Sequence, residues 1–511
     1  MLDPVLLPLL WACSGEPAPP PLPPLPPKVE TDPYGPRGEI RPVRELVIAL
    51  TGEVRGEIEP CGCPTVPYGG FVRRGTLLDR LRAQGVPVFV LDAGDMLIKG
   101  EPAAENGDRN ERARAVLDLA AATGLDAWAP GPTDLLVGGL GTLSGSGALA
   151  ANWTDAGGDP VFPAASLIER EGIRLGVIGL GGEPHGLGTK DPVDAARAAM
   201  NGLVADTWVA LSNLDPAENL RVAEQVPGLG AVLATRKDQL DPPRTTNGAP
   251  IIETSDRGRY VGLVRVALGS DGAAWSPVEA GPLRDLAEER TRVGRLDATG
   301  QAAAGTRIAG LRAELDAVAE GRDLVYVEER PLGSDLDAEG PVRTRVERWK
   351  GLAVQAAQQR SASKPVVAGY ASGAACFDCH TDRFNSWLFD PHARAYDALL
   401  PRGKGLDVEC VACHTTAWGK PGGNAQLDTE AMRTWKAVQC EACHGPAAGH
   451  PEHAEVKPTV PEESTCRGCH DRANSPEFDY ARYRARLSCT SASIREREQG
   501  DTPKPLDGTV P

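Results

Sequence analysis

Cys376-Phe377-Asp378-Cys379-His380 opens the stretch that decides how the last third of this chain folds. The same Cys-x-x-Cys-His spacing returns at Cys410–His414, Cys440–His444 and Cys466–His470. This spacing is typical of covalent haem attachment, in which two thiols bond the porphyrin and the adjacent imidazole binds the iron. The sequence therefore predicts four haem c groups bound within one short segment.

Zinc is the alternative interpretation, because paired Cys-x-x-Cys motifs also build zinc sites. A zinc site does not need a histidine directly after the second cysteine, yet all four pairs have one, although the chain has only 8 histidines in 511 residues. Haem is therefore favoured. The predicted attachment residues are Cys376, Cys379, Cys410, Cys413, Cys440, Cys443, Cys466 and Cys469. The predicted proximal iron ligands are His380, His414, His444 and His470.

Candidate distal ligands are scarce. Only His392, His450 and His453 remain in this segment, so four irons cannot all receive a second imidazole from it. We expect at least one five-coordinate iron, unless His185 or a side chain such as Met432 binds, although an isolated methionine more often serves packing. Two imidazole ligands favour electron transfer, whereas an open iron offers a position for a small molecule.

Three flanking stretches carry a more specific resemblance: Trp387–Ala395, Thr415–Gly419 and Val438–Pro446. Because of these flanking stretches and the order of the four motifs, residues 366–490 resemble the tetrahaem cytochrome c-554 family of nitrifying bacteria. The resemblance implies a mainly α, haem-packed cytochrome c domain that passes electrons onward from hydroxylamine oxidation. It also implies distal ligands at His392 and at either His450 or His453, and a five-coordinate second haem.

Net charge and composition limit the partners. The net charge is −16, the pI is about 5.1, and no run of basic residues is present. Nucleic acid is therefore excluded as a partner, because phosphate binding requires clustered Lys and Arg. Redox proteins remain the expected partners.

The N-terminus predicts export. Haem attachment of this kind occurs outside the cytoplasmic membrane, and residues 5–11 form a short apolar run before Leu10-Trp11-Ala12-Cys13, which resembles a lipoprotein box. A proline-rich stretch follows and favours an extended spacer. We predict a signal peptide over residues 1–13, a lipid anchor at Cys13 and a tether over 14–43. The predicted location is the periplasm, or the outer membrane or cell surface as a lipoprotein.

Apolar runs alternate with amphipathic stretches over residues 44–280, which predicts an α/β domain with a largely covered sheet. The predicted strands are 46–50, 86–91, 175–180, 208–211 and 231–234, and residues 251–268 predict a terminal hairpin. The predicted helices are 75–84, 111–122, 192–204 and 217–226. Two further helices, 286–318 and 342–358, are predicted in a connector over 281–365, and 491–511 is predicted to be a disordered tail.

With Leu91-Asp92-Ala93-Gly94-Asp95, this order of elements resembles the calcineurin-like metallophosphoesterase domain of bacterial 5′-nucleotidases, and implies its α/β sandwich. Active members bind two metals through several histidines. Here Glu53-Val54-Arg55, Gly131-Pro132-Thr133-Asp134, Asn213 and Ala234–Lys237 replace the family's motifs, and Asp95 alone is retained. One carboxylate cannot hold two metals, so the domain is expected to be inactive as a phosphohydrolase.

Cys61, Cys63 and Cys489 lie outside the haem motifs. The first two are too close together for an unstrained disulfide with each other. Their role is left open between metal binding, a disulfide with another cysteine such as Cys489, haem contact and a purely structural role.

The expected function is therefore electron relay by an exported four-haem cytochrome, with the phosphoesterase-like domain as scaffold or docking module. One alternative is an oxidoreductase acting on a nitrogen or sulfur compound at an open haem. Another is an active metallophosphohydrolase carrying a redox-sensing cytochrome domain.

Overall fold

A computed structural model describes residues 43–60, 67–98, 109–137, 140–235, 242–254, 257–270, 272–294, 296–363, 369–402, 404–405, 408–424, 429–470, 474–475 and 477–489. The predicted signal peptide, nearly all of the tether, Cys13, Cys61, Cys63 and the tail lie outside these residues. In the part that is described, no helix is long and apolar enough to cross a membrane.

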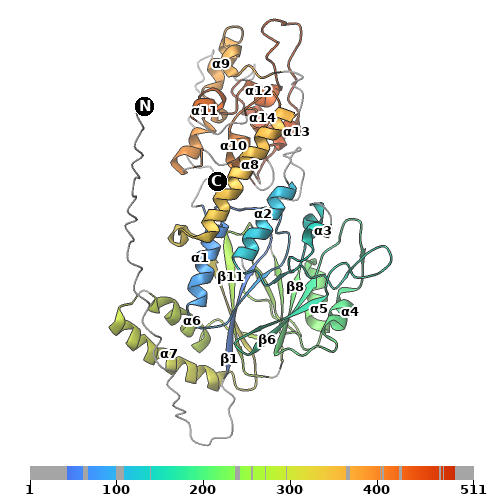
Figure 1. Ribbon diagram of the computed structural model, residues 1–511, viewed down its shortest axis with the longest axis vertical. Coiled ribbons are helices and arrows are strands. Elements are labelled where there is room, and N and C mark those ends of the chain that lie inside the picture. The colour runs from blue at the N-terminus through green and yellow to red at the C-terminus, as the bar shows by residue number, and fades with distance from the viewer. Residues whose placement is uncertain are drawn as a thin grey trace, which may run out of the picture. The chain divides into compact units, whose positions relative to one another are not determined.

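Two β-sheets form the frame of the N-terminal region (Figure 1). The first contains β1 (Arg44–Thr51), β2 (Val88–Asp92), β3 (Ala127–Trp128), β11 (Tyr260–Leu268), β12 (Ser276–Pro277) and β13 (Leu324–Pro331), in the order β12-β13-β11-β1-β2-β3. The second contains β5 (Ala165–Arg170), β6 (Ile173–Leu180), β8 (Thr207–Ser212), β9 (Ala231–Thr235) and β10 (Ile251–Thr254), in the order β10-β9-β8-β6-β5. β4 (Trp153–Thr154) pairs separately with β7 (Gly188–Thr189).

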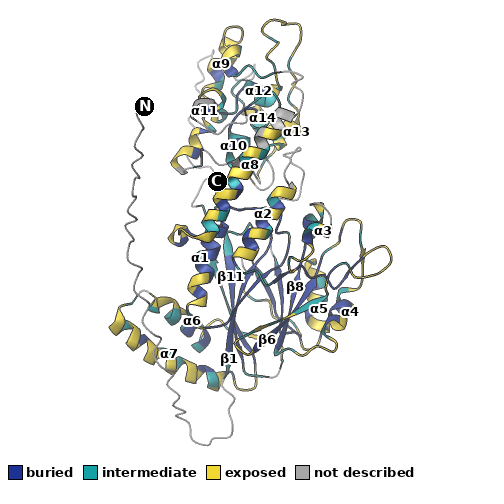
Figure 2. Ribbon diagram, in the orientation of Figure 1, coloured by how far each residue is buried: buried dark blue, intermediate teal, exposed yellow. Residues whose placement is uncertain are grey.

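The main core lies between the two sheets. Ile48 and Leu50 of β1 pack with Val264 of β11 and with Val177 and Leu211 of the second sheet, and all five are fully buried. Figure 2 shows the same pattern, with the strands buried and the exposed residues mostly on helices and loops. Each such apolar side chain contributes roughly 1.5–3 kcal/mol by leaving water. Continuous apolar strands therefore produce a sandwich covered on both sides.

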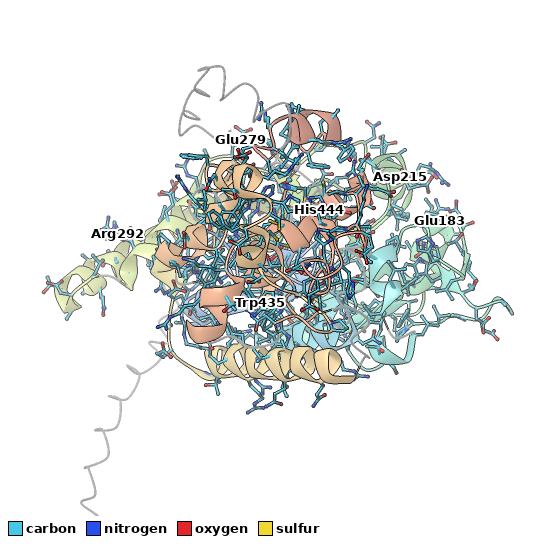
Figure 3. The ribbon with its side chains drawn as sticks, turned by 90° about the horizontal axis from the view of Figure 1, so that it is seen from above. Glu183, Asp215, Glu279, Arg292, Trp435 and His444 are labelled. Carbon is cyan, nitrogen blue, oxygen red and sulfur yellow. The ribbon has the colours of Figure 1, made fainter. Side chains whose placement is uncertain are left out.

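Helices cover the outer faces of the sheets. They are α1 (Phe71–Arg82), α2 (Arg109–Ala122), α3 (Leu140–Leu143), α4 (Pro192–Met200), α5 (Pro216–Gln225), α6 (Pro282–Val293), α7 (Ala298–Val318) and α8 (Pro341–Ser363), with 3₁₀ turns at Pro132–Leu136 and Ser334–Leu336. Asp191 caps α4 and Asp215 caps α5 (Asp215 is labelled in Figure 3). Each carboxylate accepts two backbone N–H groups from the first turn of its helix, and a proline directly follows each aspartate. The predicted helices in this region all form, with shifted ends.

Three predictions about the first region need correction. Residues 251–268 do not form a hairpin, because β10 pairs with β9 in one sheet and β11 pairs with β1 and β13 in the other. The helix predicted over 286–318 is two helices, α6 and α7. The connector also supplies β13, which the sequence pattern did not predict and which completes the first sheet.

Ion pairs attach α6 and α7 to the first sheet. Both terminal guanidinium nitrogens of Arg290, Nη1 and Nη2, donate to Glu45 of β1, at 2.6 and 2.9 Å, and Arg312 of α7 donates to the same carboxylate at 3.2 Å. Burial opposes ionisation of Glu45, but these two arginines outweigh it and lower its pKa. The helix pair is therefore fixed to the sheet by charge as well as by apolar packing.

The C-terminal region is built from short helices. They are α9 (Thr381–Trp387), α10 (Val408–His414), α11 (Thr429–Trp435), α12 (Cys440–His444), α13 (Glu463–Arg467) and α14 (Tyr480–Ala485), with 3₁₀ turns at Gly373–Cys376, Pro391–Arg394 and Asp397–Arg402. The predicted order, an α/β region followed by a mainly helical one, is confirmed.

Apolar packing differs sharply between the regions. Among the described residues, the buried apolar cluster of the C-terminal region contains only Tyr396, Leu399, Val411 and Met432. Met432 is therefore a packing residue here, as isolated methionines usually are. Such a small cluster is a weak core for a segment of this length, unless another apolar group supplies the rest.

Candidate haem-binding site

Each Cys-x-x-Cys-His motif lies on a single helical turn. The backbone N–H of His380 donates to the carbonyl of Cys376, and that of His470 to Cys466, both at 2.9 Å. Residues three and four apart share one face of a helix, so both thiols and the imidazole of a motif are directed to the same side. This is the arrangement that haem attachment requires. Trp435 and His444, at the ends of α11 and α12, are labelled in Figure 3.

The imidazole rings of His380 and His450 lie near each other and are almost parallel. Their ring centroids are 6.3 Å apart and their planes differ by only 9°. Imidazole nitrogens bind transition metals at about 2 Å, so two rings on opposite sides of one metal ion have centres roughly 6 Å apart. This spacing would fit one iron, for which His380 is the expected proximal ligand and His450 an expected distal ligand.

A second pair consists of His392 and His470. Their centroids are 6.0 Å apart and their planes are inclined by 75°. Phe478 and Tyr483 pack on His470, with ring centroids at 5.0 and 5.3 Å. The spacing again fits one iron, and the distal residue expected at His392 lies opposite the proximal histidine of the fourth motif.

Hydrogen bonds orient most of these rings. Nδ1 of His414 donates to the carbonyl of Ala395 at 2.6 Å, that of His444 to Thr459 at 2.9 Å, and that of His450 to Val456 at 2.8 Å. A carbonyl oxygen can only accept, so the proton is on Nδ1 and the lone pair is on Nε2. Metal-binding histidines are commonly held in this way by their second nitrogen.

His414 and His444 have no facing imidazole among the described ring contacts. His453 lies beside Glu455, 3.4 Å away, with 65% of its side chain exposed. Of the two distal candidates after the third motif, His450 is therefore the one placed opposite a proximal histidine. His185, the histidine of the first region, is exposed in a loop.

Thiols of different motifs lie close together in space. The Cys376 thiol is hydrogen-bonded to Cys440, which lowers the pKa of Cys376 to about 7 and raises that of Cys440. Cys469 is likewise hydrogen-bonded to Cys413, and this contact raises the pKa of Cys469. The first motif is thus adjacent to the third, and the second to the fourth. These cysteines form no disulfide.

Glu441, inside the third motif, holds the first motif in place. Its side chain is 3% exposed and accepts the backbone N–H groups of Ala371, Ser372 and Ala447 at 2.8–3.1 Å. Gln439 adds a bond from the N–H of Gly373 at 2.6 Å. The sequence analysis assigned no role to either residue, although both lie in a flank that carried the family resemblance.

Asp390 is the other residue that the sequence analysis missed. It is 3% exposed, and Oδ1 lies 3.0 Å from Nδ1 of His392. Oδ2 accepts the N–H and hydroxyl of Ser488 at 2.9 and 2.8 Å. Burial opposes its ionisation, but the bonds from His392 and Ser488 outweigh this and lower the pKa of Asp390. An acidic residue two positions before a candidate ligand was the available signal.

At the place expected for a phosphoesterase metal site, the side chains bind one another. Oδ1 of Asp95 accepts the N–H and hydroxyl of Thr133, at 3.0 and 2.6 Å, and Oδ2 lies 3.3 Å from Nδ2 of Asn213. Glu53 forms an ion pair with Arg55 instead of pointing an open carboxylate into the site. Over the described residues, no group of three or more metal-binding side chains is found.

Asp134 is used structurally. It is fully buried and accepts the N–H groups of Leu97 and Gly131, at 2.8 and 2.9 Å. Burial, with a smaller effect from nearby Asp95, raises its pKa well above the ordinary value. These bonds fix the turns after β2 and β3.

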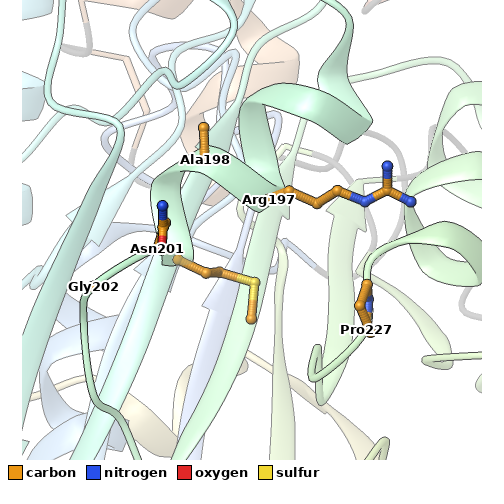
Figure 4. A pocket seen from close by; sticks show the side chains of 6 residues that line it. Arg197, Ala198, Asn201, Gly202 and Pro227 are labelled. Carbon is orange, nitrogen blue, oxygen red and sulfur yellow. The ribbon is translucent and has the colours of Figure 1, made fainter.

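An open hollow of about 480 Å³ lies elsewhere, between the end of α4 and Pro227 (Figure 4). Its lining is Arg197, Ala198, Met200, Asn201, Gly202 and Pro227. It contains one charged side chain and no carboxylate or imidazole, and it is far in sequence from the haem motifs.

Comparisons with known proteins agree with this division of the chain. Residues 375–445 match the family model described as cytochrome c554 and c-prime. A cytochrome c-554 from Nitrosomonas europaea is 33% identical over 86 residues, which cover 14% of this chain and 36% of that protein. The chain therefore spans about a third of the length of this curated relative. The match implies covalently bound haem c in this part.

Solved structures resemble the rest of the chain. A 5′-nucleotidase precursor from Thermus thermophilus is 18% identical, with a TM-score of 0.44, over 68% of this chain and 66% of that one. The calcineurin-like phosphoesterase YfkN from Bacillus subtilis is 15% identical, with a TM-score of 0.43, over 62% of this chain and 99% of that one. Both families expected from the sequence are represented among these matches.

Proposed function

We propose that this protein is an exported c-type cytochrome that relays electrons through four covalently bound haems. The observation that carries the proposal is the pair of imidazole couples, His380–His450 and His392–His470, each with the spacing that fits one iron. Both couples lie in the segment that holds all four attachment motifs. When bound, haem iron supplies one-electron chemistry, and its axial ligands set its potential.

The residues of this segment support the proposal in two further ways. Large apolar side chains are exposed, among them Phe389 at 72% and Val460 at 75%, as expected of surfaces that a porphyrin would cover. The thiol contacts connect motif one with three and motif two with four, and Cys443 and Cys466 are near enough for their charges to interact. The attachment points thus form one connected series rather than four separate sites.

The predicted phosphoesterase-like region is proposed to act as scaffold or docking module. The Asp95 carboxylate accepts hydrogen bonds from Thr133 and Asn213, and Glu53 is paired with Arg55. Among the described residues, no group of three or more metal-binding side chains is found. Export, with a lipid anchor at Cys13, is proposed from the sequence alone, and redox proteins are the proposed partners.

Haem counting tests the central proposal. Full-length protein, purified from a host that matures c-type cytochromes, should give four haems per chain by pyridine haemochrome assay and a matching excess of mass. Replacing Cys376 and Cys379 with alanine should reduce the count to three, whereas Cys489→Ala should leave it at four. A mass equal to that of the bare polypeptide would refute the proposal.

A second candidate is small-molecule chemistry at an open haem. It is favoured by His414 and His444, which have no facing imidazole among the described residues. Nitric oxide added to the holoprotein should then change the spectrum of a high-spin haem, and substrate-dependent turnover of a nitrogen or sulfur compound should accompany it. Binding without turnover would leave electron relay as the function.

A further inference from the structure

Asp390 differs from the other groups that orient the candidate iron ligands. Nδ1 of His414, His444 and His450 donates to a neutral backbone carbonyl, and Nδ1 of His470 lies 2.8 Å from the hydroxyl of Ser475. His392 alone among these is oriented by a buried carboxylate. The other bonds to that carboxylate come from neutral groups, the backbone N–H of His392 and the N–H and hydroxyl of Ser488.

We propose that Asp390 is a positioning residue that holds His392 on the iron of the fourth motif and makes that haem harder to reduce than the haem between His380 and His450. The inference rests on the proposed function and deepens it. A carboxylate that accepts the Nδ1 proton makes the imidazole a stronger electron donor, and a stronger donor stabilises the ferric state. The low exposure of Asp390 keeps its negative charge effective, since little water lies between charge and ligand.

Geometry also restricts how Asp390 can act. Its Oδ1 accepts both the backbone N–H of His392, at 3.0 Å, and the ring proton, so the ring is fixed relative to its own turn. Its Oδ2 is occupied by Ser488, so the carboxylate cannot rotate away from the ring without losing two hydrogen bonds. The C-terminal segment around Ser488 therefore contributes to the orientation of a candidate iron ligand far from it in sequence.

The two imidazole couples can be followed separately. Their interplanar angles are 9° and 75°, and near-parallel and near-perpendicular imidazole planes give different low-spin ferric EPR signals. In EPR-monitored redox titration of the unmodified holoprotein, the near-perpendicular signal should disappear at a lower potential than the near-parallel one. The opposite order would overturn the inference, even in a protein with four haems, whereas a protein without haem would instead refute the proposed function.

The Asp390→Asn variant provides a second test of the proposal. At a fixed potential, the ratio of ferrous to ferric haem in the near-perpendicular site should rise about tenfold, which corresponds to 59 mV for one electron. The near-parallel site should not change. Loss of the near-perpendicular signal in this variant, with its return in Asp390→Glu, would equally support positioning. An unchanged signal at an unchanged potential would overturn the inference.

Two control variants distinguish the effect of Asp390 on its ligand from two other effects. These are a general change of net charge and the loss of the hydrogen bond between Asp390 and the Ser488 hydroxyl. Asp382→Asn makes the same change of charge on an exposed residue of α9 and should not shift either potential. Ser488→Ala removes one bond to Asp390 but leaves the carboxylate and its charge, so it should leave the potential order unchanged. An equal shift in Asp382→Asn, or a full shift in Ser488→Ala, would overturn the inference.

Discussion

At the scale of single residues, a few buried acceptors order the C-terminal region. Glu441 and Asp390 each connect parts of the chain that are distant in sequence, and each is 3% exposed. Their importance could not be predicted from the haem motifs, because many of the groups that they bind lie far away in sequence and are brought to them only by folding. The attachment cysteines and proximal histidines, by contrast, are predicted from motif spacing alone.

Glu441→Ala should destabilise the holoprotein by about 3 kcal/mol, because three partly buried N–H groups lose their charged acceptor. Denaturant unfolding, followed by tryptophan fluorescence and haem absorbance, measures the change. The matched control is Glu463→Ala in α13, where an exposed carboxylate pairs only with Arg467, and it should cost no more than about 0.5 kcal/mol. Equal midpoints for the two variants would contradict the role given to Glu441.

His450 and His453 provide a second residue-scale test. His450→Ala should convert one low-spin haem to high spin, because His450 lies opposite His380, whereas His453→Ala should leave the spectrum unchanged. Optical and EPR spectra of the ferric protein distinguish the two states. If the effects were exchanged, His453 would be the distal ligand.

At the scale of elements, local sequence patterns predicted where strands and helices lie better than they predicted which strands pair in a sheet. The apolar runs at β1, β6 and β8 were sufficient to predict buried strands. Residues 251–268 were wrongly predicted to be a hairpin, because sequence neighbours often pair, yet β11 lies between β1 and β13 and β10 extends the other sheet. Sheet membership depends on contacts far apart in sequence, which a local pattern does not encode.

The attachment of α6 and α7 to β1 predicts a pH effect. The pKa of Glu45 is lowered in the folded protein from its reference value of 4.5, so the ion pair stabilises the fold above that pH, and the contribution is lost as the pH falls below it. Glu45→Gln should therefore cost about 2 kcal/mol at neutral pH and progressively less toward pH 3. Urea unfolding of both proteins across this range measures the difference, and a pH-independent difference would contradict the argument.

At the scale of the whole molecule, the chain divides into an apolar sandwich and a segment whose own buried cluster is small. The first could be anticipated from alternating patterns. The adjacency of motif one to three and of two to four could not, because no local feature of the motifs states which of them meet.

This division predicts that the sandwich does not hydrolyse phosphate esters. With Mn²⁺ and a nucleoside monophosphate, phosphate release should not exceed the blank, because the Asp95 carboxylate accepts hydrogen bonds from Thr133 and Asn213. Asp95→Asn serves as the control for contaminating phosphatase and should give the same baseline. Metal-dependent release by the native protein that disappears in the variant would show an active site.

The thiol contacts between alternate motifs have a consequence for biogenesis. A chain that ends after α11 carries two attachment motifs, and these belong to different neighbouring pairs. Motif one gains its spatial neighbour only when α12 has been made, and motif two only when the fourth motif has been made. The proposed electron relay is therefore complete only in a chain that carries all four motifs.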